Sequence, residues 1–427
     1  MNKHTLRPAR ELLLLAGAAI ALQAVTWSLL LGLYTSGVWY GLREFSDTPY
    51  YLAISQHIAR GEWPYVNFPF EYPPLTLLFV GLSPALGTVA SYDRWFSAEM
   101  IVICMASAAI VAIIAARAWG GLGRPLGAAA GFAAAVIAAG AISLNRFDPA
   151  VGLIVALSVL ALVYRRFTLA GVAVGLGFAL KLVPIVLLPL VLVLAARRRP
   201  VVCAAVAAGI AAVVPFVPFL VRSSAAFTGA LQGQTARGLQ IESVAATPYL
   251  AWKAMIHGAS VAVVSPIGSP VIDAPGADLV ARLAPLIVLG LLVAVYAGIW
   301  RARAHLRANP EWVAPAAVAA MLAFMCGNKV LSPQHVLWIL PLVALCLAAR
   351  QPSHRAVGVV LLAAIALTQV EFPGLYSRVV ALESVPLLVI VARNILLMVA
   401  FVLVVASLWG LPSTRKREAR TPALGDF

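Results

Sequence analysis

Charged residues are scarce in this chain: they make up 11% of its 427 residues, whereas 62% are hydrophobic and the mean hydropathy is +0.95. So little charge excludes an ordinary soluble domain, which needs a polar surface. Apolar runs of about 17–25 residues recur along the sequence, and each is long enough to cross a hydrocarbon core about 30 Å thick. Backbone groups in lipid must bond within their own segment, so the composition predicts an all-α polytopic membrane protein.

Metal and nucleotide signatures are also missing. The four cysteines fall inside apolar stretches, without metal-like spacing or the pattern of a disulfide framework. There is no DxD pair, no histidine cluster and no glycine-rich phosphate loop, so we expect no metal site. The excess of 31 basic over 16 acidic residues does not indicate nucleic acid, because the basic residues cluster in short loops between apolar runs.

The arginines predict a topology. We expect about 12 transmembrane helices, near 11–36, 95–117, 125–143, 149–164, 167–179, 182–196, 200–221, 279–300, 312–327, 335–349, 356–370 and 384–409. With an uncleaved, cytoplasmic N-terminus and a cytoplasmic C-terminus, every cytoplasmic turn is then basic. The carboxylates collect on the other side, which is therefore the outer one.

The chain is predicted to form a single integral membrane domain, 1–427. Two long outer segments, 37–94 and 222–278, and a basic cytoplasmic tail, 411–427, interrupt the apolar pattern. The apolar run 75–90 would invert the next turns if it spanned the membrane, so we expect a helix along the outer surface. The pair 167–179 and 182–196 is short for two full spans and predicts a hairpin with Lys181 at its outer tip.

Polar residues at the expected outer helix ends fall at one depth. They are Asn145 to Asp148, Lys181, Asn328 and Lys329, Ser332 to His335, and Glu371. Ionisable groups at membrane depth are costly, so they pair with one another or serve function. An outward-facing cavity lined by acids and cations would suit a substrate that is anionic in one part and carbohydrate in another.

Motifs in order along the chain sharpen this picture. They are GEWPY (Gly61–Tyr65), EYPPL (Glu71–Leu75), RFDPAVGL (Arg146–Leu153), AGVAVGLGFALKLVPIVLLPL (Ala170–Leu190) and KVLSPQHVLWILPL (Lys329–Leu342). With an acid in the first outer loop, they resemble the GT-C superfamily of integral membrane glycosyltransferases. Within it, the chain is similar to glycosyltransferase family 87, the bacterial mannosyltransferases that depend on polyprenol-phosphate mannose.

The resemblance implies a GT-C-like bundle with its active site on the outer face, formed by the first outer loop. It also implies an inverting transfer in which a carboxylate accepts the proton of the acceptor hydroxyl. Asp47, in that loop, is our candidate for this base, and Glu44, Glu71 and Asp148 are its rivals. A structural alternative is that Ser46 or Asp47 caps a helix beginning near Thr48 and Pro49.

Cations are expected to hold the donor phosphate. Arg146 and Lys181 are candidates, although Arg146 could simply pair with Asp148 and Lys181 could extend its head to the interface. Lys329 and His335 lie together at an outer helix boundary, where an imidazole can donate to a phosphate or a sugar hydroxyl. Substrate-binding roles are likewise predicted for Tyr72 and Gln334, although tyrosines populate every membrane interface.

The family resemblance points to a protein of the bacterial plasma membrane that needs no cofactor. Its partners would be a polyprenyl-phosphate sugar, mannose in the first place, a glycolipid or lipoglycan acceptor and the lipid bilayer. The alternatives are an outward-facing transporter, a flippase or a ligase for lipid-linked glycans. Transporters usually show internal repeats and mid-membrane sites, and neither is apparent in this sequence.

Overall fold

The computed structural model describes residues 8–35, 45–81, 88–224, 228, 237–256, 259–265 and 269–412. The helices are α1 (Ala9–Thr35), α2 (Thr48–Ala59), α3 (Leu77–Val80), α4 (Val89–Trp119), α5 (Gly123–Ala139), α6 (Ile142–Asn145), α7 (Asp148–Val163), α8 (Phe167–Lys181), α9 (Leu188–Ala195), α10 (Arg198–Val213), α11 (Val217–Arg222), α13 (Thr247–Met255), α14 (Ala277–Arg301), α15 (Arg303–Ala308), α16 (Val313–Gly327), α17 (Leu340–Ala348), α18 (Pro352–Gln369), α19 (Tyr376–Val380) and α20 (Ser384–Trp409). The strands β1 (Ala262–Val264) and β2 (Val271–Asp273) pair antiparallel. Short 3-10 or π-helical segments are η1 (Pro74–Thr76), η2 (Val183–Leu187), η3 (Val214–Phe216), η4 (Val244–Ala246), η5 (Pro310–Trp312), η6 (Pro333–Ile339) and η7 (Val370–Leu375).

The prediction of an all-α membrane architecture is confirmed in its main part. Seven helices within the described ranges are long and apolar enough to cross a membrane, and five further apolar helices are shorter. These twelve segments lie where the hydropathy of the sequence placed them. Only the seven longer ones reach the length of a full crossing on their own, because a helix rises 1.5 Å per residue.

One expected element is described only in part. Of the surface helix predicted over 75–90, the described residues form η1, α3 and the start of α4, and residues 82–87 lie outside the described part. The helix that follows, α4, begins at Val89 rather than near residue 95. The reason is a cap, because the side chain of Thr88 accepts a hydrogen bond from the backbone N–H of Ser91 and starts the helix early.

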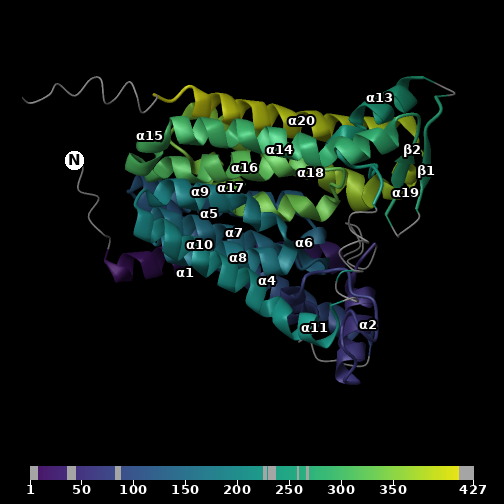
Figure 1. The fold of residues 1–427 in the computed structure, drawn as a ribbon, viewed down its shortest axis with the longest axis horizontal. Coiled ribbons are helices and arrows are strands. Elements are labelled where there is room, and N and C mark those ends of the chain that lie inside the picture. Colours follow the sequence, from purple (N-terminus) through teal and green to yellow (C-terminus); the bar gives the residue numbers. More distant parts are fainter. Residues whose placement is uncertain are drawn as a thin grey trace, which may run out of the picture.

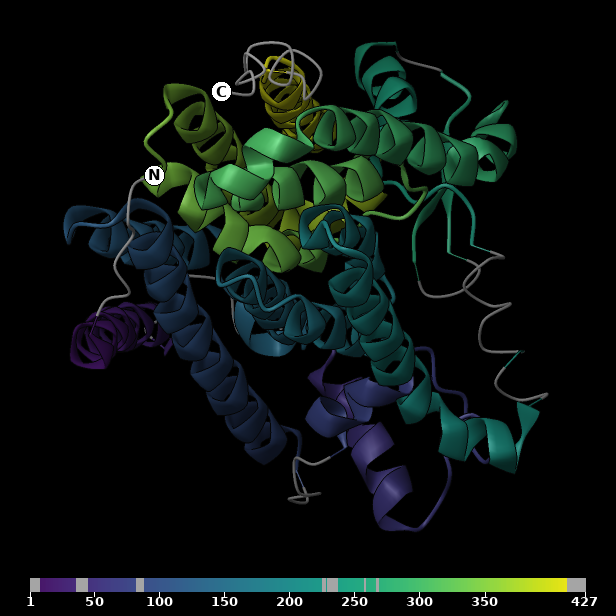
Figure 2. The ribbon, with the colours of Figure 1, turned by 60° about the vertical axis from the view of Figure 1, so that its left-hand side comes forward.

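The helices form one bundle, and the long helices run along the longest axis of the molecule (Figure 1). The purple and blue N-terminal helices lie on one side, the green and yellow C-terminal helices on the other, and teal segments lie between them (Figure 2). In α16, 83% of the most apolar stretch is buried, against 17% in α14. The helix α16 is therefore a core element, whereas α14 presents an apolar surface that suits contact with lipid.

The two ends of the bundle differ in chemistry. We call them the α2 end, which also carries α11, α13, α19 and both strands, and the α15 end (Figure 1). At the α15 end, arginines donate to carbonyl groups at helix ends: Arg124 to Ala348, Arg350 to Trp119 and Arg307 to Val193. Guanidinium groups satisfy free carbonyls there and oppose the negative end of each helix dipole. The arginines expected in cytoplasmic turns thus gather at one end of the molecule.

Candidate active site

Asp47 lies directly before α2 but does not cap it. Its side chain makes no capping hydrogen bond. The hydroxyl of Ser46 accepts the N–H of Thr48 instead (3.1 Å), and Pro49 fits the first turn, where an N–H has no helical partner. Of the two expected capping residues, Ser46 therefore takes this role. The carboxylate of Asp47 is left for other contacts.

Those contacts are with Arg146 and Tyr51. The Nε atom of Arg146 lies 2.9 Å from Oδ2 of Asp47, and the Tyr51 hydroxyl donates to the same oxygen (3.4 Å). Arg146 sits in extended backbone between α6 and α7, and it also donates to the carbonyl groups of Phe45 (2.7 Å) and Asn145 (3.0 Å). The expected alternative, a pair between Arg146 and Asp148, is wrong, because the break between the helices turns Arg146 toward Asp47.

Asp148 pairs with Lys181 instead. The first residue of α7 meets the last residue of α8, with Nζ of Lys181 3.1 Å from Oδ1 of Asp148. The indole N–H of Trp338 donates to the same oxygen (2.6 Å). Aromatic faces surround the ammonium, with Phe147 at 4.5 Å and Tyr72 at 5.3 Å from Nζ to the ring centroids. Lys181, only 14% exposed, is thus a fixed cation rather than a mobile surface lysine.

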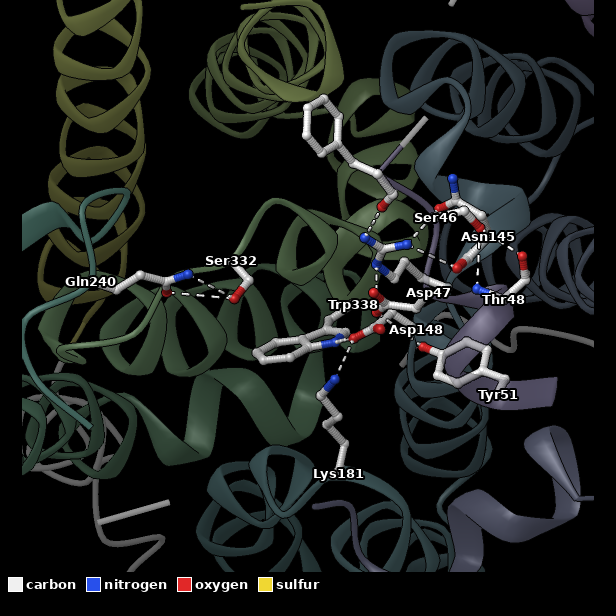
Figure 3. A network of polar contacts seen from close by, with 12 residues as sticks. Ser46, Asp47, Thr48, Tyr51, Asn145, Asp148, Lys181, Gln240, Ser332 and Trp338 are labelled. Atoms are coloured by element: carbon white, nitrogen blue, oxygen red, sulfur yellow. Dashed lines mark hydrogen bonds and ion pairs between the residues drawn. The ribbon is translucent and has the colours of Figure 1, made fainter. Parts of the chain in front are cut away.

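The two ion pairs stand side by side (Figure 3). Burial raises the pKa of Asp47 above its usual value, and the charges of Arg146 and Lys181 oppose this rise. A carboxylate in that position binds a proton more readily than one in water does, because its charged form has lost hydration. Asp148, fully buried, is committed to Trp338 and Lys181. Of the two acids, Asp47 is the one that lines the cavity.

A cavity of about 640 Å³ opens onto this cluster. One part of its lining is polar, and the other is apolar and comes from η2, η3 and the helices beside them. The predicted residues that line the polar part are Asp47, Glu71, Tyr72, Arg146, Lys181, Lys329, Gln334 and His335. The apolar part is lined by Phe178, Leu182, Val183, Ile185, Val186, Phe216 and Phe324. The cavity thus has the two-sided character that an amphipathic ligand requires.

The predicted polar residues are held in place by the wall of the cavity. Glu71 pairs with Arg237 (2.9 Å), and His335 stacks on Trp338 with ring centroids 4.0 Å apart. Lys329 accepts the backbone N–H of Gln240 through its carbonyl group, and burial lowers the pKa of its ammonium. The loop before η6 and the segment after Arg237 therefore form one wall.

The site contains residues that the sequence analysis did not select. Gln240 and Glu242 line the cavity, and Gln240 donates to Ser332 (3.1 Å) on the far side of Trp338 from Asp47 (Figure 3). The sequence does contain an indication of them, since both are polar residues of the second expected outer segment. Glu44 lies outside the described residues, and Asp148 supports the site without lining the cavity.

No grouping in the described ranges resembles a metal site, since no three His, Cys, Asp or Glu side chains there lie close enough together to hold an ion.

Comparison with known proteins gives the family. The chain is similar to two solved structures of ArnT from Cupriavidus metallidurans, one bound to undecaprenyl phosphate and one in the apo state. The TM-scores are 0.47 and 0.42, each at 15% identity over 90% of this chain and 76% of that chain. No curated protein matches the sequence. Residues 70–333 match glycosyltransferase family 87, and because the match takes in more than half of the sequence, the chain belongs to that family.

Proposed function

We propose that this membrane glycosyltransferase moves a sugar from a polyprenyl-phosphate donor to a glycolipid or lipoglycan. Mannose is the sugar that we propose. The observation that carries the proposal is the two-sided cavity, in which Asp47, Arg146 and Lys181 face one space that continues into an apolar lining. A lipid-linked sugar phosphate has the same order of parts: a carbohydrate, an anion and a hydrocarbon chain. A nucleotide sugar would leave the apolar part unmatched.

In the proposed reaction, the acceptor hydroxyl oxygen attacks the anomeric carbon while the bond from that carbon to the phosphate oxygen breaks. The bonding pair leaves with the phosphate, and the hydroxyl proton passes to the carboxylate of Asp47. Because attack comes from the face opposite the leaving group, the anomeric configuration inverts. The raised pKa of Asp47 favours its action as a base.

Lys181 is the proposed cation for the departing phosphate. Its ammonium already has Asp148 as a partner and is held between aromatic rings, so its position is set before the substrate arrives. A preorganised charge stabilises developing negative charge more effectively than a mobile one, because it needs no reorganisation during the reaction. Arg146, whose guanidinium is bound to Asp47 and to two carbonyl groups, is proposed to position the base.

The test is transfer of radiolabelled mannose from polyprenyl-phosphate mannose to a membrane lipid extract, by the purified wild type and by Asp47→Asn. We expect the wild type to transfer and Asp47→Asn to lose about 10²–10⁴-fold of the rate, as for removal of a general base. The matched control is Glu62→Gln, in the same segment but paired with His57 away from the cavity. Asp47→Asn removes no cap from α2 but does remove the ion pair with the buried Arg146, so the thermal unfolding temperature of each variant is measured beside its rate to show that it is folded.

Equal rates for wild type and Asp47→Asn would keep the enzyme class and reject the role of Asp47, and the base would then be sought at Glu44 or Glu71. Absence of transfer from mannose, glucose, galactose and arabinose donors alike would contradict the proposed donor class. The transporter alternative would then move ahead.

A further inference from the structure

A second acid lines the cavity away from Asp47. Glu242 is fully buried, and its Oε2 atom accepts a hydrogen bond from Nε2 of Gln240 (2.8 Å). Its carboxyl group is also hydrogen-bonded to that of Glu371. Glu242 is thus a buried polar group that lines the cavity, held by Gln240 and Glu371 and not by the residues that surround Asp47.

The backbone around Glu242 is fixed from two sides. From α20, the guanidinium of Arg393 donates to the carbonyl of Glu242 (2.9 Å), and the amide of Asn394 donates to the carbonyl of Ser243 (3.0 Å). The backbone N–H of Gln240 donates to the carbonyl of Lys329 (3.0 Å). Arg393 and Asn394 are fully buried in an otherwise apolar helix. The position of Glu242 is thus set by the protein before any ligand binds.

The charges around Glu242 favour its neutral form. Two acids, Glu242 and Glu371, lie around one cation, Arg393, whose Nη2 atom is 3.3 Å from Oε2 of Glu371. Burial, together with the charge of Glu371, holds the pKa of Glu242 well above its usual range. A protonated carboxyl group donates one hydrogen bond and accepts others, which matches the hydroxyl groups of a sugar.

An aromatic surface lies beside this acid. Tyr376 and Phe372 both line the cavity, and their rings meet edge to face at 4.9 Å. Phe45 contacts Tyr376 from a further side, at 5.4 Å, and this fixes the ring. Flat aromatic side chains next to a few placed polar groups are the usual lining of a small-molecule site.

We infer that Glu242 and Tyr376 bind a pyranose ring of the substrate, the acid through a ring hydroxyl and the aromatic side chain through the apolar face of the ring. This subsite deepens the proposed function and rests on it. The cavity then has a charged end for the phosphate and the base, and a neutral hydrogen-bonding end for a sugar. The sugar belongs either to the donor or to the acceptor, and kinetics separate the two.

The experiment measures KM for polyprenyl-phosphate mannose and for octyl α-mannoside as acceptor, in the wild type, Glu242→Leu, Glu242→Gln and Tyr376→Leu. We expect Glu242→Leu and Tyr376→Leu to raise the same KM, each by about tenfold, as for an unpaired polar group or a lost ring contact. Glu242→Gln, which keeps a neutral donor and acceptor, should remain within about threefold of the wild type. The substrate whose KM rises is the source of the bound sugar.

The control is Glu383→Gln, an acid paired with Arg378 outside the cavity, which should change neither KM. A merely structural role of Glu242 would lower the amount of active enzyme, and hence kcat, and leave both KM values unchanged. If Glu242→Leu fails to fold, Tyr376→Leu carries the test. Unchanged KM values in every folded variant would overturn the subsite while leaving the transfer reaction intact.

Sugar binding can also be measured without catalysis, by comparing the thermal unfolding temperature with and without methyl α-mannoside. Protection of the wild type that is lost in Tyr376→Leu or Glu242→Leu supports the subsite, even where transfer of mannose fails and the proposed reaction is rejected. Absence of protection in the wild type, together with unchanged KM values, overturns it.

Discussion

Asp47 combines burial with two nearby cations, and these act on its proton in opposite directions. Burial raises the pKa of Asp47, while Arg146 at 2.9 Å and, further away, Lys181 lower it. A general base works in its deprotonated form, so the rate falls as the pH drops through this pKa. Because burial prevails, we expect the acid limb of the kcat/KM profile to lie above the usual range of an aspartate. A limb within that usual range would contradict the prediction.

Arg146→Gln tests the electrostatic part of this balance. Without the guanidinium charge the pKa of Asp47 rises further, and the acid limb should move to higher pH. Arg146→Lys keeps a positive charge and should leave the limb closer to that of the wild type, even if it lowers the rate by losing the contact with Phe45. The measurement is kcat/KM for transfer against pH in all three proteins. An unmoved limb in Arg146→Gln would show that another group controls the profile.

Single residues were predictable where their chemistry stands out from their surroundings. Asp47, Lys181 and His335 are polar residues at the ends of apolar runs, and the structure brings them to one cavity. Their pairing was not predictable, because it depends on how α6, α7 and α8 end relative to one another. Arg393 was missed although an ionisable residue within an apolar helix is a strong signal; nothing in the sequence connects it with Glu242.

At the scale of elements, α8 and α10 lie so close together that small residues are required. A Cβ atom at Gly171 would collide with the carbonyl oxygen of Ala204, and one at Gly175 with that of Ala208. The two glycines are four residues apart and share one face of α8, the spacing that allows close helix contact in membranes. Because α8 ends at Lys181, this contact also fixes the proposed phosphate-binding cation.

We therefore expect Gly175→Ala to destabilise the protein by about 1–3 kcal/mol, as for overpacking of a tight contact. Gly209→Ala, on α10 with open space around the new atom, should leave stability equal or slightly higher, since alanine favours helix over glycine. Unfolding temperatures in detergent compare the two variants, and transfer rates should follow them because Lys181 moves with α8. An equal effect of both substitutions would contradict the close contact.

The hydropathy of the sequence was sufficient for the apolar helices, because lipid allows few alternatives to a helix. It was less successful at irregular segments, where local caps decide the outcome. Thr88 starts α4 early, and the described residues of the helix expected over 75–90 form η1, α3 and the start of α4. Leu182, directly after α8, has a positive φ of 44°. Neither the hydrophobic periodicity nor the composition of the sequence predicts this turn, although it determines the position of Lys181.

At the scale of the whole molecule, the ends of the bundle are chemically distinct. The proposed site lies at the α2 end, and the arginines that satisfy helix carbonyls lie at the α15 end. Basic residues remain on the cytoplasmic side during insertion, so the α15 end is predicted to face the cytoplasm and the cavity to face outward. Figure 1 shows α15 and α19 at opposite ends, which makes the prediction testable with one residue from each.

Ala381, directly after α19, and Ala308, the last residue of α15, are both exposed alanines. Each is changed to cysteine in a Cys203→Ser background, which removes the exposed thiol and leaves Cys104, Cys326 and Cys346 buried. A membrane-impermeant maleimide added to intact cells should label Ala381→Cys and not Ala308→Cys, and both should react after permeabilisation. The reverse pattern would place the cavity on the cytoplasmic side, where a donor displayed on the outer leaflet would not reach Asp47, and the proposed outer-face transfer would fall.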